Sequence, residues 1–135
     1  MTQTDRFTAV FLDHFPDQMV EGQLYISHKF AMAGLLCPCG CRGETTVKMS
    51  PARYRVILDG EVSLEPSIAA TALPCNSHYF ITRGEVEWHA KLSTDQREFA
   101  KARDERAVEE LRVARRTGIW WAVRRRVLRI FTRSR

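Results

Sequence analysis

Short runs in which apolar and polar residues alternate fill much of the first 90 positions, and this period of two predicts strands. Residues 30–36 are apolar throughout, which predicts a buried strand. The N-terminal arm has only a short apolar cluster at 10–12, and we expect one short strand or an arm lying against the core. The further strands expected before position 50 lie at 24–27 and 45–49.

Two hairpins are predicted after position 50. The first joins strands 54–58 and 62–64 through Asp59-Gly60, a dipeptide that favours tight hairpin turns. Pro66 is expected to end this hairpin, so that residues 66–74 form a connection. The second joins strands 79–82 and 85–88 through Arg83-Gly84. The pattern therefore predicts a mainly β fold built from a small antiparallel sheet domain.

The periodicity changes from Ser93 onward and predicts C-terminal helices. Ser93 followed by Gln96 forms a capping box, and no Gly or Pro occurs from there to Arg116. Thr117-Gly118 is expected to break the helix before a second helical pattern at 119–131. We therefore expect a β-rich metal-binding domain at 1–90 and a basic helical extension at 91–135.

All four cysteines lie in two short segments, and the second segment adds a histidine. They are Cys37, Cys39, Cys41 and Cys75, with His78 three residues after Cys75. Thiolates together with imidazole are a common tetrahedral ligand set for zinc. Five candidates for four positions predict a closed, structural site with one spare thiol among the first three, and we favour Cys39 and Cys41 as ligands.

The alternative for the cysteines is disulfide pairing or inert buried thiols. Cysteines two positions apart form strained bridges, and the N-terminus has no pattern typical of a secretory signal. No apolar run approaches the ~20 residues that span a bilayer. We therefore expect reduced cysteines and a cytoplasmic protein.

The two cysteine segments resemble the paired boxes of a Rieske domain. Cys39-x-Cys41-x-Gly43 matches the first box except at Cys41, where the Rieske pattern has histidine, and Cys75-x-x-His78 matches the second. The resemblance implies a Rieske-like or zinc-ribbon-like fold that holds two metal loops. It also implies an alternative cofactor, a [2Fe-2S] cluster, and an alternative function in electron transfer.

Charge is distributed unevenly along the chain, whose net charge is +5. Residues 1–90 carry 7 Lys and Arg against 10 Asp and Glu, a balance of −3, whereas residues 91–135 carry 14 against 6, a balance of +8. The segment from Arg112 to Arg135 contains nine arginines, no acidic residue and the pair Trp120-Trp121. This segment predicts contact with a membrane surface, with nucleic acid, or with the acidic domain or a protein partner.

Four separated motifs resemble an uncharacterised family of small bacterial zinc-binding proteins. The motifs are Leu24-Tyr25-Ile26-Ser27, Cys37-Pro38-Cys39-Gly40-Cys41, Ser63-Leu64-Glu65-Pro66-Ser67-Ile68 and Cys75-Asn76-Ser77-His78-Tyr79. Arg42 departs from the family pattern, which usually has glycine there, and Ala69-Ala70 replaces a usual Gly-Asn-Trp. Such proteins are often encoded beside ubiquitin-like conjugation or defence genes. The resemblance implies an accessory role with a partner from a ubiquitin-like pathway.

No sequence pattern for catalysis stands out beyond the metal ligands: the chain has no Gly-rich phosphate loop, HExxH or Gly-x-Ser-x-Gly. The leading hypothesis is therefore a non-catalytic zinc-binding adaptor. A ligase-like accessory factor with a reactive spare cysteine among Cys37, Cys39 and Cys41 is a further alternative.

Overall fold

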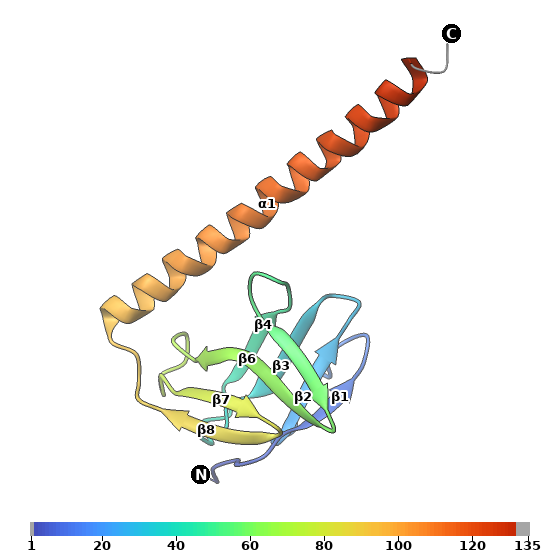
Figure 1. Ribbon diagram of the computed structural model, residues 1–135. Coiled ribbons are helices and arrows are strands. Elements are labelled where there is room, and N and C mark those ends of the chain that lie inside the picture. The colour runs from blue at the N-terminus through green and yellow to red at the C-terminus, as the bar shows by residue number, and fades with distance from the viewer. Residues whose placement is uncertain (1, 132–135) are drawn as a thin grey trace.

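The fold consists of eight strands followed by a long helix. The computed structural model describes the backbone of residues 2–131 and the side chains of residues 2–118. The mainly β class with a helical C-terminal segment is confirmed (Figure 1). The elements are β1 (Thr8–Phe11), β2 (Gln23–Ser27), β3 (Met32–Leu36), β4 (Glu44–Lys48), β5 (Arg55–Asp59), β6 (Glu61–Ala69), β7 (His78–Thr82), β8 (Glu85–His89) and α1 (Thr94–Phe131).

The strands form two four-stranded sheets, ordered β1-β2-β3-β4 and β5-β6-β7-β8. Every neighbouring pair is antiparallel except β1 and β2, which are parallel. The inner faces of both sheets contribute to one apolar core, so the two sheets stabilise each other. Its largest fully buried apolar side chains are Tyr79, Phe7, Leu24, Ile26, Leu35, Leu64 and Ile81.

Both predicted hairpins are present, and their turns use the backbone freedom that the sequence indicated. Gly60 between β5 and β6 has a φ of 74°, and Gly84 between β7 and β8 has a φ of 78°. Glycine adopts this left-handed region without steric cost. The expected buried strand at 30–36 is also confirmed as β3, whose last four residues are buried.

The expected end of the first hairpin at Pro66 is confirmed, but the expected connection at 66–74 is wrong in its first part, because β6 continues to Ala69 beside β7. Pairing with β5 stops at Glu65, and the register with β7 shifts between Leu64 and Ile68. Proline cannot donate a ladder hydrogen bond but is tolerated at such an irregularity. The residues that the sequence assigned to a loop therefore lie partly within the sheet.

The expected helix break at Thr117-Gly118 is also wrong, because α1 is continuous through it. The Thr117 hydroxyl donates to the carbonyls of Val113 and Ala114, and one glycine costs only about 1 kcal/mol in a helix interior. The capping box is confirmed: the Ser93 N–H donates to Gln96 Oε1 at 2.9 Å, and the Gln96 N–H donates to Ser93 Oγ at 3.3 Å.

One narrow face of the N-terminal half of α1 is partly buried, and it lines hollows that the helix shares with the β domain. The half-buried side chains recur three or four positions apart, as expected for one side of a helix. They include Arg97, Ala100, Asp104, Ala107 and Leu111. In the part of the chain that the structure describes, no helix is both long and apolar enough to cross a membrane. The Trp and Arg side chains expected to form an amphipathic face beyond Gly118 lie outside the described residues.

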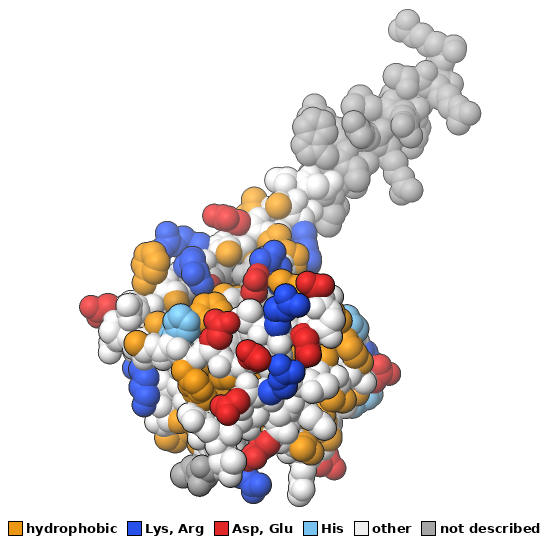
Figure 2. Space-filling model, turned by 60° about the horizontal axis from the view of Figure 1, so that its bottom comes forward, with side chains coloured by type: hydrophobic (Ala, Val, Ile, Leu, Met, Phe, Trp, Pro, Cys, Tyr) orange, Lys and Arg blue, Asp and Glu red, His pale blue; other side chains and the backbone are white. Residues whose placement is uncertain are grey.

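Charged side chains of both signs are interspersed over the face of the β domain seen in Figure 2. Arg6 contacts Glu61 at 3.4 Å and Glu85 at 3.0 Å, and Arg55 contacts Glu65 at 2.7 Å. Such exposed ion pairs each contribute about 1 kcal/mol or less. The face seen in Figure 2 is therefore mixed in charge rather than uniformly acidic or basic.

Candidate functional site

The four cysteine sulfurs converge at one point between two loops. Cys37, Cys39 and Cys41 lie in the loop between β3 and β4, and Cys75 lies in the loop before β7. All four Sγ atoms lie within 4.8 Å of one another. The two remote loops that the sequence predicted to share an ion are therefore adjacent.

The spacing of the sulfurs fits a single tetrahedral ion. Four sulfurs about 2.3 Å from a central zinc would lie about 3.8 Å from one another. The distances are 3.4 Å between Cys37 and Cys39, 3.8 Å between Cys37 and Cys75, and 3.7 Å between Cys41 and Cys75. The cluster is thus compatible with a metal ion such as zinc, bound by four thiolates.

Tight backbone turns direct the three thiols of the first loop toward the cluster. Gly40 has a φ of 85° and Arg42 a φ of 59°, so Arg42 occupies a conformation that glycine would adopt more readily. The Cys37 N–H donates to the Gly43 carbonyl at 2.8 Å and closes the loop. The Gly43 N–H in turn donates to Cys41 Sγ at 3.4 Å. N–H···S bonds of this kind favour the thiolate that a metal requires.

The thiols differ in their affinity for protons. Burial raises the pKa of Cys37 well above its usual range and also raises the pKa of Cys41. Burial acts in the same direction on Cys75, but hydrogen bonds from the Ser77 hydroxyl and N–H and from the neighbouring thiols outweigh it and lower the pKa of Cys75 to about 6. Cys75 is therefore the most readily formed thiolate among these three.

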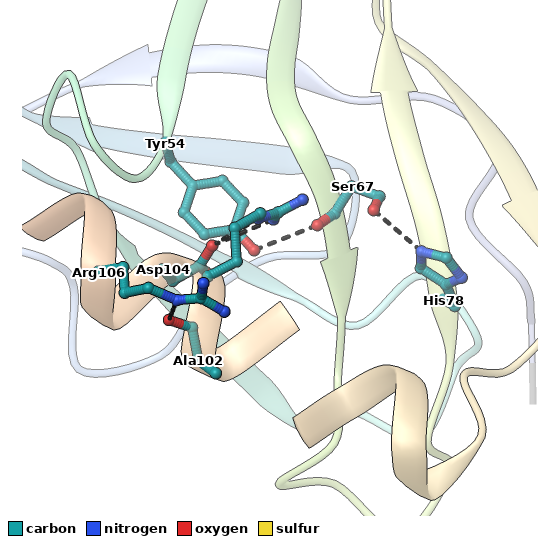
Figure 3. Close-up of polar contacts among 7 residues, drawn as sticks. Tyr54, Ser67, His78, Ala102, Asp104 and Arg106 are labelled. Carbon is teal, nitrogen blue, oxygen red and sulfur yellow. Dashed lines mark hydrogen bonds and ion pairs between the residues drawn. The ribbon is translucent and has the colours of Figure 1, made fainter. Parts of the chain in front are cut away.

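His78 does not belong to the group of converging sulfurs. Its two ring nitrogens contact other groups: Nδ1 lies 2.8 Å from the Ala90 carbonyl oxygen, and Nε2 lies 2.9 Å from Ser67 Oγ. The structure thus brings together the four cysteines among the expected ligands and places the histidine beside a serine (Figure 3).

The hydrogen bonds of His78 define its tautomer. A carbonyl oxygen can only accept, so Nδ1 carries the proton and donates to Ala90. In a neutral imidazole Nε2 then has a free electron pair and accepts the Ser67 hydroxyl proton. A serine paired in this way with an oriented histidine can act as a nucleophile with an adjacent general base.

The irregularity in β6 positions Ser67 beside His78. His78 pairs with Ala69 and Tyr79 with Ile68, but the three β6 residues at 65–67 then lie opposite the single β7 residue Phe80 before the register resumes at Leu64. The extra residues include Ser67, whose hydroxyl lies beside the His78 ring. Bulges of this kind re-aim a side chain.

Tyr54 fixes the backbone of Ser67 from the other side. Its hydroxyl donates to the Ser67 carbonyl at 3.2 Å (Figure 3). Burial raises the pKa of Tyr54 and the Asp104 carboxylate raises it further, so the hydroxyl remains a donor. The Ser67 side chain is half-buried and lines a cavity of about 640 Å³ between the sheet and α1. The Ser67 side chain is therefore open to this cavity.

Sequence reasoning did not identify Ser67 as a functional residue. His78 was noticed only for its spacing from Cys75, which is typical of a metal ligand. A usable signal was present, because the two residues lie in two of the four motifs that carry the family resemblance. The pairing itself depends on the β6 irregularity, which no local pattern indicates.

A family model described as "Bacterial ubiquitination-like system serine protease (BubE)" matches residues 11–89 of the chain, which is more than half of it. The matched segment contains the four cysteines, Ser67 and His78. No curated protein and no solved structure matches the chain significantly.

Proposed function

The chain belongs to the BubE family of bacterial ubiquitination-like systems, and we propose that it hydrolyses polypeptides with Ser67 as the nucleophile and His78 as the general base. The observation that carries the proposal is the 2.9 Å contact between Ser67 Oγ and His78 Nε2. The family description, which names a serine protease, supports the same chemistry. A non-catalytic adaptor would not require this pairing, so we favour the hydrolase.

The reaction proceeds in two halves. Ser67 Oγ attacks the carbonyl carbon of the scissile bond while its proton moves to His78 Nε2. Nε2 then gives that proton to the leaving group, and the bond to the leaving group breaks, which leaves the acyl group as an ester on Ser67. Water attacks this ester in the second half, with His78 again taking and returning the proton, and Ser67 is regenerated.

The Ala90 carbonyl takes the orienting role that an aspartate has in a Ser-His-Asp triad. It holds the Nδ1 proton in place, which keeps Nε2 available for Ser67. A carbonyl carries only a partial negative charge, so it stabilises the imidazolium less than a carboxylate does. We therefore expect slow turnover compared with enzymes that use a full triad.

Zinc bound by Cys37, Cys39, Cys41 and Cys75 would act as a structural ion. Four thiolates fill the tetrahedron and leave no open position for a substrate. A bound ion would supply a crosslink between the β3–β4 loop and the loop that leads into His78. A [2Fe-2S] cluster is less suited to this arrangement, because it divides its ligands between two irons, and the Rieske type needs two histidines.

The substrate class suggested by the family description is a protein of a ubiquitination-like system, and we propose such a protein as the partner. Residues 1–90 carry all of the proposed site residues. Part of α1 lines the cavity at Ser67, so the extension at 91–135 contributes to the substrate site as well.

The proposal is tested by exposing the full-length protein to a library of unstructured decapeptides and detecting cleavage products by mass spectrometry. Wild type is expected to produce fragments, and Ser67→Ala is expected to produce none above background. Ser63→Ala is a matched control, because Ser63 lies on the same strand and its hydroxyl accepts the Arg83 N–H at 2.8 Å. Equal cleavage by wild type and Ser67→Ala would contradict the assignment.

A further inference from the structure

Strand β4 is an edge strand whose outer side has free backbone groups. Within the register of β3 and β4, the Cys37 N–H donates to the Gly43 carbonyl and the Met49 N–H donates to the Ala31 carbonyl. Odd-numbered residues of this segment therefore face β3, and even-numbered residues direct their N–H and C=O groups outward. Among the described residues, the Lys48 carbonyl accepts the Tyr54 N–H, but no backbone partner meets Glu44 or Thr46.

A groove runs along this outer side toward Ser67. One cavity, of about 410 Å³, is lined by β4 on one wall and by residues 68–73 on the other. The cavity at Ser67, of about 640 Å³, adjoins it. The two hollows share five lining residues: Arg53, Tyr54, Ala69, Thr71 and Asp104. The free strand edge and the proposed nucleophile therefore open into adjoining parts of one groove.

We infer that an extended segment of the substrate polypeptide adds to β4 as an outer strand and thereby presents its scissile carbonyl to Ser67. The inference rests on the proposed function, since it takes Ser67 as the nucleophile. An extended chain has free N–H and C=O groups at the spacing that Glu44 and Thr46 offer. A helix pairs its backbone groups internally, so it would leave the outward N–H and C=O groups of Glu44 and Thr46 without hydrogen-bond partners.

Helix α1 closes one side of this groove. Asp104 lines both cavities, and neighbouring α1 side chains line the part at Ser67. The groove is therefore bounded by β4, by residues 68–73 and by α1. Recognition through the β4 backbone makes binding depend on the extended conformation of the substrate more than on its side chains.

The first test compares two substitutions at Thr46 with the decapeptides that wild type cleaves. Thr46→Pro removes the outward N–H, and proline is tolerated on an edge strand. We expect kcat/KM to fall about ten-fold, mainly through a higher KM, which corresponds to one lost hydrogen bond. Thr46→Ala keeps the N–H and is expected to stay within about two-fold of wild type, as for a surface substitution. Equal kcat/KM for Thr46→Pro and wild type overturns the inference.

A second test does not depend on the folding of a variant. Cleaved peptides are resynthesised with one backbone amide N-methylated at a time, at positions three or more residues from the cleaved bond. Because alternate residues of an added strand face β4, methylation is expected to block cleavage at every second position within the segment that contacts the edge. Uniform tolerance, or equal loss at successive positions, overturns the inference.

A fluorophosphonate, a small reagent that phosphonylates activated serines, separates this inference from the proposed function. It needs no strand pairing, so Thr46→Pro should be labelled at Ser67 as fast as wild type. Labelling of Ser67 without cleavage of any library peptide would overturn the inference that substrate binds in the groove, but would agree with Ser67 as the nucleophile. Absence of labelling in wild type would overturn the proposed function itself.

Discussion

Ser67 Oγ and His78 Nε2 lie 2.9 Å apart, although the two residues belong to different strands and are 11 positions apart in the chain. The contact exists because an irregularity in β6 moves Ser67 beside a histidine whose other nitrogen is held by the Ala90 carbonyl. Three backbone features thus produce an arrangement suited to nucleophilic catalysis: the bulge, the β7–β8 hairpin and the end of β8.

Replacing His78 by glutamine should slow phosphonylation of Ser67 strongly. The variant loses the group that takes the hydroxyl proton, a role that typically contributes about 10²–10⁴-fold to the rate. The second-order rate constant with a fluorophosphonate measures the effect. His28→Gln is the control, because His28 stacks on Phe11 in the other sheet and is exposed. A rate unchanged in His78→Gln would remove His78 from the mechanism.

Tyr54→Phe tests the positioning of Ser67 without touching the reacting atoms. The substitution removes the hydroxyl that donates to the Ser67 carbonyl and should cost about 1 kcal/mol of stability. We expect kcat to fall several-fold while KM changes little, because the backbone of the nucleophile is less well fixed. A purely structural role would lower the melting temperature and leave kcat of the folded protein unchanged.

Zinc analysis distinguishes the four-cysteine site from a site that includes His78. Each of the four Cys→Ser variants should lose the metal and destabilise the fold by at least about 3 kcal/mol, since structural zinc binding is folding free energy. His78→Gln should keep one zinc per chain. Elemental analysis and thermal unfolding measure both properties. A Cys→Ser variant that keeps its zinc, together with zinc loss in His78→Gln, would support three cysteines and the histidine instead.

Gly43 in the β3–β4 loop and Leu73 in the loop before β7 lie close together. A Cβ at Gly43 would lie 2.6 Å and 2.7 Å from the two methyl carbons of Leu73. Gly43→Ala should therefore cost about 1–3 kcal/mol through overpacking. Gly118→Ala is the control, because a Cβ there meets nothing within 4 Å.

The double variant Gly43→Ala/Leu73→Ala checks the cause of this cost. Leu73→Ala loses packing of its own but removes the clash, so the two effects should be less than additive by about 1 kcal/mol or more. Thermal unfolding of the two single variants and the double variant gives the interaction energy. Strict additivity would show that the two loops do not press against each other there.

The sequence predicted those parts of the fold that depend on local patterns. Apolar patterning located β2, β3, β4, β5, β7, β8 and the start of β6 to within two residues, and Asp59-Gly60 and Arg83-Gly84 located both hairpins, because tight turns constrain residue choice at one or two positions. It failed for residues 66–69, which continue β6 beyond Pro66, and at Thr117-Gly118, because each breaking residue is accommodated by its surroundings. Pro66 lies where strand pairing is already interrupted, and Gly118 is preceded by strong helix formers.

The candidate sites, like the fold, could be predicted only where a local sequence pattern indicated them. Clustering and spacing sufficed to predict that Cys37, Cys39, Cys41 and Cys75 converge at one point, in an arrangement compatible with a metal ion. Spacing also suggested His78 as a ligand, whereas its ring nitrogens contact Ser67 and Ala90. Those contacts depend on strand register across three strands, which periodicity does not specify.

The most direct test of the account is to identify the residue that a fluorophosphonate modifies in the full-length protein. Peptide mapping by mass spectrometry after stoichiometric labelling locates the phosphonyl group. We expect one adduct, on Ser67, that is absent in Ser67→Ala and retained in Ser63→Ala. An adduct on another residue, or no adduct on folded zinc-loaded protein, would contradict it.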